Sequence, residues 1–238
     1  MYLRQYIKTN TVKKLVLLII VIFSSCLEKD KFNPELKSEL SSILIRDQGF
    51  RELFNGNITE KRKSELLKLL EISEADFLEN ERDIFRKNDS LNLIKIEKII
   101  NKYGYPGKSL VGEPENETAW FVIQHSGKIA DYFPVIEKAG QKGELDLVKV
   151  AMMKDRLLMN LEEEQLYGSQ GKRIFLVWPP IKQTDSKVII WPIKNPATVN
   201  TLRQQIGFKN TVEEYAQSLG IDYKPYTLSE VNQMNSAK

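Results

Sequence analysis

The chain has 238 residues, with 35 Lys and Arg, 32 Asp and Glu, one histidine and one cysteine. The formal net charge of +3 includes four basic and no acidic residues within 1–25, so the other 213 residues carry 31 basic and 32 acidic groups. Their net charge of −1 gives no reason to expect a nucleic-acid partner or an acidic membrane surface. One histidine and one cysteine exclude the usual zinc sites. A length of 213 residues suits one domain with a substantial core.

Residues 1–25 have the features of a lipoprotein signal peptide. A basic segment precedes the unbroken apolar run Leu15 to Phe23, which is shorter than the roughly 20 residues that a membrane-spanning helix needs. The sequence Phe23-Ser24-Ser25-Cys26 resembles the lipobox of bacterial lipoproteins. We therefore expect Cys26 to carry several acyl chains, palmitate among them, which hold a bilayer more firmly than one chain. The alternative is an ordinary secretory signal with an incidental cysteine.

These features predict an exported protein that is anchored in the bacterial cell envelope. Acylated Cys26 would bind the lipid bilayer, and residues 26–33 would form a tether. Leu27 follows the cysteine, where an Asp resembles a signal for inner-membrane retention, so we expect the outer membrane. The remaining chain divides into a helical domain over 34–222 and a loosely held tail over 223–238.

Hydrophobic periodicity predicts a mostly α-helical single domain with a small C-terminal β-hairpin. The expected helices cover 34–54, 59–72, 73–103 with a kink near 88–90, 114–127, 129–142, 145–164, 196–206 and 211–219. A glycine-rich loop is expected over 104–112. The runs 174–178 and 188–191 are rich in β-branched and aromatic residues, and these predict the hairpin.

Polar residues interrupt the apolar stripes of two predicted helices. Asp47 and Arg51, with Gln48 beside them, occupy core-facing positions of the first helix. Asp89 and Asn92 do the same in the third. Because a buried charge without a partner is costly, we expect these side chains to meet other polar groups in a shared pocket.

The only histidine, His125, follows Gln124 in the last turn of a predicted helix. The partial negative charge at a helix C-terminus favours a protonated imidazole. His125 is therefore a candidate proton donor near neutral pH. A capping role at the helix end is the alternative.

Asp155 lies among apolar neighbours on its helix, with Arg156 turned about a quarter-turn away. A carboxylate in that place needs a partner from another segment. The candidates for this partner are Arg51, His125, Lys108 and the backbone amides around Gly168. The alternative to a functional role is a buried structural ion pair.

A compact polar loop, residues 165–170, follows the helix that carries Asp155. Gln165, Tyr167 and Gln170 can each donate and accept hydrogen bonds, and Gly168 is a candidate helix C-cap. The loop suits either a ligand site or a set of structural hydrogen bonds.

The ordered set of these motifs resembles a bacterial family catalogued as domain of unknown function 6624. The motifs are Asp47-Gln48 with Arg51, Asp89 with Asn92, Tyr103-Gly104-Tyr105-Pro106, Gln124-His125, Asp155-Arg156, Gln165 to Gln170, and Trp191 to Pro196 followed by Val199-Asn200 and Arg203. Tyr105 and Ser169 stand where the family usually has tryptophan and threonine. The resemblance brings no established activity, but it implies that the scattered polar positions form one constellation.

Three functions fit the sequence. The first is an envelope lipoprotein whose polar pocket binds a small molecule, peptide or glycan fragment. The second is a hydrolase or transferase in which His125 acts as general acid or base, Asp155 orients it and Arg156 or Arg51 clamps the substrate. The third is a structural or partner-binding lipoprotein. No cofactor or metal is expected, although Asp47, Asp89 and Asp155 leave a hard cation as a weak alternative.

Overall fold

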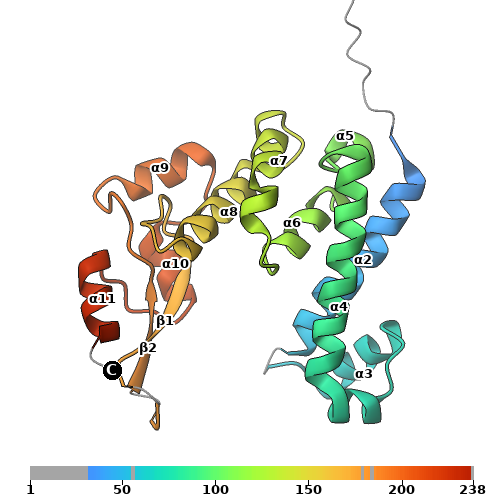
Figure 1. Ribbon diagram of the computed structural model, residues 1–238, viewed down its shortest axis with the longest axis horizontal. Coiled ribbons are helices and arrows are strands. Elements are labelled where there is room, and N and C mark those ends of the chain that lie inside the picture. The colour runs from blue at the N-terminus through green and yellow to red at the C-terminus, as the bar shows by residue number, and fades with distance from the viewer. Residues whose placement is uncertain (1–31, 55–56, 178–179, 183–184, 237–238) are drawn as a thin grey trace, which may run out of the picture. The chain divides into compact units, whose positions relative to one another are not determined.

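The computed structural model describes residues 32–54, 57–177, 180–182 and 185–236. The expected signal peptide, Cys26 and the tether up to residue 31 lie outside the described residues. The described residues form ten α-helices, one 3₁₀ helix and a two-stranded antiparallel hairpin (Figure 1). The prediction of a mostly α-helical fold with a small hairpin near the C-terminus is confirmed.

Three helices form the first part of the fold: α2 (Pro34–Leu53), α3 (Glu60–Leu69) and α4 (Glu74–Tyr103). Each begins at a polar residue, Asn33, Thr59 or Ser73, whose side chain accepts a hydrogen bond from a backbone amide of the first turn. Such caps satisfy amides that have no partner inside the helix. A cluster of apolar side chains joins these helices where α2 ends and α4 begins.

The kink of α4 lies at Asn80, where φ is −124° and ψ is 19°. The prediction of a kink near 88–90 is therefore wrong. Asn88 is buried and Asp89 bonds to α2, so tertiary contacts hold this polar stretch in the helix. Leu78, two residues before this kink, has 68% of its surface exposed.

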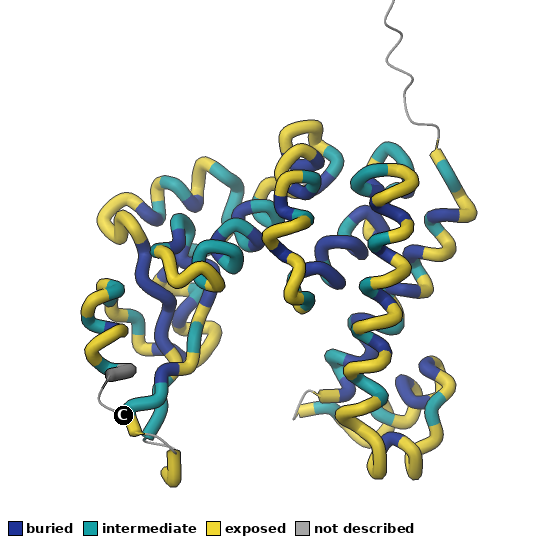
Figure 2. The backbone as a smooth tube through the Cα atoms, viewed as in Figure 1, coloured by how far each residue is buried: buried dark blue, intermediate teal, exposed yellow. Residues whose placement is uncertain are grey.

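The expected loop 104–112 contains one helical turn, α5 (Lys108–Val111). The helix expected over 114–127 is shorter and is divided into a 3₁₀ turn, η1 (Glu115–Glu117), and α6 (Thr118–Ile123). His125 therefore lies in the turn beyond α6. Most of α6 is buried (Figure 2), since it contacts both α2 and α4.

Two further helices, α7 (Ile129–Gln141) and α8 (Leu147–Asn160), pack against each other. Their apolar side chains join those of α2, α4, α5 and α6 in the main hydrophobic core. α8 ends at Asn160, four residues before the predicted end, and Asp155 faces inward with no exposed surface.

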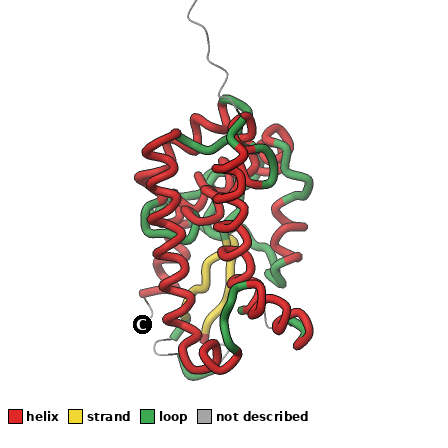
Figure 3. The backbone as a smooth tube through the Cα atoms, turned by 90° about the vertical axis from the view of Figure 1, so that its right-hand side faces the viewer, coloured by secondary structure: helices red, strands yellow, loops and turns green. Residues whose placement is uncertain are grey.

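The C-terminal part contains the hairpin and three helices. Strand β1 (Gly171–Phe175) pairs with β2 (Ser186–Ile190) in antiparallel register, from Gly171 opposite Ile190 to Phe175 opposite Ser186 (Figure 3). The helices α9 (Val199–Ile206) and α10 (Val212–Ser218) lie within the predicted ranges.

The tail does not fit the loosely held segment expected over 223–238. It forms α11 (Leu228–Ser236), which contacts β1, and Val231 in this helix is fully buried. The segment is held because Val231 packs with Ile174 and Trp191 of the hairpin. None of the helices in the described part of the chain is long and apolar enough to span a bilayer.

Candidate functional site

Arg51 on α2 is held between two carboxylates. Its Nη2 atom donates to Oδ1 of Asp47, one turn earlier on α2, at 3.3 Å, and to Oδ1 of Asp89 on α4 at 3.0 Å. Gln48 Nε2 donates to the other oxygen of Asp47 at 2.7 Å. The guanidinium lies over the ring of Phe85, 5.0 Å from its centroid. The fold thus brings together four of the residues that the sequence singled out.

The two carboxylates differ in their surroundings. The Asp47 side chain is 1% exposed, whereas that of Asp89 is 29% exposed. Burial raises the pKa of Asp47, and the charge of Arg51 and the hydrogen bond from Gln48 oppose this rise. Because an isolated buried carboxylate would be strongly disfavoured, Asp47 depends on Arg51 for its charge compensation.

A pocket of about 330 Å³ lies beside this group. Its walls include the carboxylates of Asp47 and Asp89, the apolar side chains of Phe85, Leu93 and Val122, and His125. A pocket of this size lies at the lower end of the range for small-molecule sites, roughly 300–1,000 Å³.

His125 is exposed at this pocket, yet the surrounding protein disfavours its charged form. Desolvation and then the positive charges of Arg51 and Arg156 lower the pKa of His125 to about 4. This shift opposes the protonated imidazole expected from the sequence. The helix ends at Ile123, so His125 lies beyond its last turn, where desolvation and then the charges of Arg51 and Arg156 disfavour the imidazolium.

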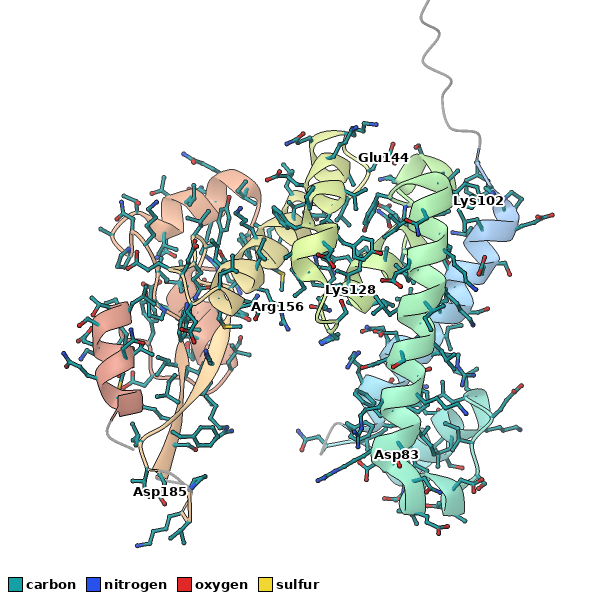
Figure 4. All side chains as sticks on the ribbon, in the orientation of Figure 1. Asp83, Lys102, Lys128, Glu144, Arg156 and Asp185 are labelled. Carbon is teal, nitrogen blue, oxygen red and sulfur yellow. The ribbon has the colours of Figure 1, made fainter. Side chains whose placement is uncertain are left out.

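Arg156 on α8 is partly buried, and Figure 4 shows its side chain extending away from that helix. Its Nη1 donates to the backbone oxygen of Gln124 at 3.4 Å. Burial lowers the pKa of Arg156, the Tyr215 hydroxyl opposes this, and Arg51 lowers it further. No ion pair among the described residues includes Arg156.

Asp155, next to Arg156 in sequence, belongs to a different group. Its Oδ1 accepts hydrogen bonds from the amides of Leu166 at 2.8 Å and Tyr167 at 3.1 Å. Its Oδ2 accepts from the amide of Ser169 at 3.0 Å and the hydroxyl of Ser169 at 2.9 Å. Burial raises the pKa of Asp155, and these hydrogen bonds oppose the rise. Of the predicted partners, only the amides around Gly168 bond to Asp155.

The polar side chains of loop 165–170 are used inside the protein. Gln165 Nε2 donates to the carbonyl oxygens of Gln170 and Trp191 at 3.0 and 2.7 Å, and Gln165 Oε1 accepts from the Gln170 amide at 2.9 Å. Gln170 Nε2 donates to the Met152 oxygen at 3.2 Å. The Tyr167 ring stacks on Phe208. Of the two interpretations of this loop, these contacts favour a set of structural hydrogen bonds.

Asn92 lies in neither group. It is 1% exposed and lines a separate pocket together with Asn88, one helical turn earlier. Sequence reasoning missed Asn88, although its spacing of four residues from Asn92 places both on one side of α4. The single shared pocket expected from the sequence is thus replaced by two pockets and one buried loop.

The three aspartates considered for a hard cation do not form a cation site. Asp47 and Asp89 bond to Arg51, and Asp155 bonds to the loop after α8. Within the described ranges, no cluster of three or more histidine, cysteine or acidic side chains could hold a metal ion.

Replacement of Asp155 by Asn should destabilise the fold, because it sets an amide NH₂ group against backbone donors that need an acceptor. We expect the free energy of unfolding in urea to fall by about 3 kcal/mol. Asp83→Asn is the matched control, since the Asp83 side chain is 82% exposed, and its effect should stay below about 0.5 kcal/mol. Equal effects of the two substitutions would contradict the structural role of Asp155.

The pKa of His125 can be measured directly, because it is the only histidine of the chain. The imidazole NMR signals of the untagged protein should titrate near pH 4, where the folded pKa lies, well below the ordinary 6.5. Between these pH values the unfolded chain binds more protons than the folded protein, so stability should fall as the pH falls from about 6.5 to about 4.

Arg156→Gln removes one of the two positive charges that act on His125, so it should raise the midpoint of this titration. A midpoint at or above 6.5 in the unaltered protein would restore the protonated imidazole expected from the sequence.

A family model described as a family of unknown function, DUF6624, matches residues 34–226. This range includes nearly all of the described residues and all the polar groups discussed above. No curated protein and no solved structure matches the chain. Because the matched range covers most of the sequence, the chain belongs to the DUF6624 family of unknown function.

Proposed function

We propose that this protein is a lipid-anchored envelope protein whose helical domain binds a small carboxylate at the group formed by Arg51, His125 and Arg156. The observation that carries the proposal is Arg156, a partly buried guanidinium with no carboxylate partner among the described residues. Its one hydrogen bond, to the Gln124 oxygen, is long at 3.4 Å.

The charges around Arg156 favour an anion. Arg51 acts on Arg156 with a like charge, and both groups lower the pKa of His125. Partly desolvated like charges repel each other, and Asp47 and Asp89 offset only the Arg51 side of this pair. A carboxylate that bonds to Arg156 would relieve this repulsion, and guanidinium groups bind carboxylates through two parallel hydrogen bonds.

The pocket beside His125 limits the size and polarity of the ligand. Neutral His125 can donate one hydrogen bond and accept another. Arg51, which bonds to the carboxylates of Asp47 and Asp89, also has a buried Nε atom without a hydrogen-bond partner. Phe85, Leu93 and Val122 offer a short apolar wall in a pocket of about 330 Å³. These features fit a small, polar carboxylate more closely than a polymer.

Binding is favoured over the hydrolase or transferase alternative because of the contacts of Asp155. The enzymatic hypothesis needs Asp155 to orient His125 as the acid or base. All the hydrogen bonds of Asp155 instead come from residues 166–169. The carboxylates that line the pocket together with His125, those of Asp47 and Asp89, are instead bonded to Arg51.

The anchor rests on the sequence. The basic segment, the apolar run 15–23 and Cys26 after Ser24-Ser25 form a lipoprotein signal, and an acylated cysteine binds a bilayer firmly when it carries more than one chain. The helical domain would then bind its ligand at the surface of the outer membrane.

Ligand binding can be tested by calorimetry with succinate, acetate and, as anion controls, sulfate and phosphate. We expect a carboxylate to bind, and Arg156→Gln to lower its affinity about tenfold to a hundredfold, because a hydrogen bond between charged groups is worth roughly 1.5–3 kcal/mol. Arg173→Gln removes a guanidinium on β1 that bonds to Ser186, and it should leave the affinity unchanged. If no carboxylate binds, or if both variants behave alike, the proposed site is wrong.

The anchor can be tested by expressing the chain with and without Cys26→Ser in a bacterium and separating the membranes. The unaltered chain should incorporate labelled palmitate and sediment with the outer membrane. Cys26→Ser should incorporate none, because Cys26 is the only cysteine. Equal labelling of the two chains would refute acylation at this position.

A further inference from the structure

A second and larger pocket, of about 660 Å³, lies between α2, the α3–α4 connection and α4. It shares no lining residue with the pocket beside His125. Its volume falls within the range of roughly 300–1,000 Å³ that small-molecule sites occupy. The fold forms this hollow where α4 kinks at Asn80 and where Glu71 takes a φ of 59° in the connection before it.

Two buried amide groups of this pocket lack partners. Asn88 and Asn92 are 6% and 1% exposed, and the Nδ2 atom of each has no hydrogen bond. They lie one turn apart on α4 and both line the pocket. Since nearly all buried polar groups in proteins are hydrogen-bonded, two adjacent exceptions require an explanation. A ligand with two acceptor oxygens would supply the missing partners.

Arg46 determines which end of Asn88 remains available. Its Nε donates to Oδ1 of Asn88 at 3.4 Å, so the oxygen of that amide is engaged and its NH₂ group is left for an acceptor. Arg46 lines the same pocket and forms no ion pair with any described residue. A carboxylate binds favourably beside a positive charge and two amide donors, because hydrogen bonds to an ionised acceptor are strengthened by charge.

An apolar wall of the pocket consists of Phe50, Leu70, Ile72, Ile84 and Leu91. Four charged residues, Glu71, Asp76, Lys87 and Lys95, line the pocket as well. Leu91 has 48% of its surface exposed, so part of this wall is in contact with solvent. Burial of such surface by the body of a ligand is favourable. A ligand with an anionic head alone would leave this wall uncovered.

We propose that this pocket binds a monocarboxylate with an apolar body, in the class of medium-chain fatty acids. The carboxylate oxygens accept hydrogen bonds from the Nδ2 atoms of Asn88 and Asn92, and their charge faces Arg46. The hydrocarbon chain lies against Phe50, Ile84 and Leu91. This site is additional to the one proposed for a small polar carboxylate beside Arg156, and it differs from that site in its demand for an apolar body.

The test is calorimetry of octanoate with the full chain in phosphatidylcholine nanodiscs, with subtraction of the heat measured in empty nanodiscs. We expect octanoate to bind with a Kd of about 1 mM or tighter. Succinate, which has two carboxylates and no apolar body, should not compete with it. Arg156→Gln should leave octanoate binding unchanged, so that failure of one proposed site is distinguishable from failure of the other.

Two substitutions in the pocket, and one control outside it, test which residues bind octanoate. Asn92→Leu removes a buried amide without a partner, so it should lower the affinity for octanoate at least tenfold while the melting temperature stays the same or rises. Arg46→Gln should also lower the affinity about tenfold, because it removes the facing charge. Asn101→Leu, at an exposed position of the same helix, is the matched control and should bind octanoate as the unaltered chain does.

The proposal is overturned if octanoate does not bind, or if succinate displaces it. It is also overturned if Arg46→Gln keeps full affinity, and this variant serves where Asn92→Leu does not fold. A large loss of stability in Asn92→Leu would show that its amide already has a partner within the protein.

Discussion

The buried carboxylate of Asp155 is the contact on which the C-terminal part of the fold depends. It accepts hydrogen bonds from the backbone amides of Leu166, Tyr167 and Ser169. These bonds hold the loop between α8 and β1 in its conformation. That loop in turn bonds to the segments that follow it. The Gln165 amide donates to the Pro192 oxygen, and the Gln170 oxygen accepts from the Trp191 amide. One charge on α8 therefore positions the start of β1 and the end of β2.

The same loop also holds the last helices. Arg203 of α9, 1% exposed, donates to the Tyr167 oxygen at 2.8 Å, and the Tyr215 hydroxyl of α10 donates to the Ser169 oxygen at 2.9 Å. Gly168 has a φ of 68°, and a side chain there would lie within 3 Å of Val212 and Ile193. The polar loop thus behaves as a structural junction, because its donors and acceptors are satisfied within the protein.

A contrasting arrangement occurs along α2 and α4, where several polar groups remain without partners. The Nε atom of Arg51 and the Nδ2 atoms of Asn88 and Asn92 are buried and make no hydrogen bond. Arg46 and Arg156 each bond to one oxygen at 3.4 Å. Groups that are desolvated but not satisfied favour binding of a ligand that completes their hydrogen bonds. This difference separates the candidate binding sites from the junction around Asp155.

The sequence alone determined the helical class and the polar residues that interrupt apolar stripes, because these depend on local spacing along the chain. Only the tertiary structure decided which of those polar residues line pockets and which form internal hydrogen bonds. Asp155 and Arg156 are adjacent, yet Asp155 bonds to the loop after α8 and Arg156 donates to the Gln124 oxygen, since neighbours on a helix point about 100° apart. The lowered pKa of His125 likewise depends on burial and then on the charges of Arg51 and Arg156, which come near it only in the folded chain.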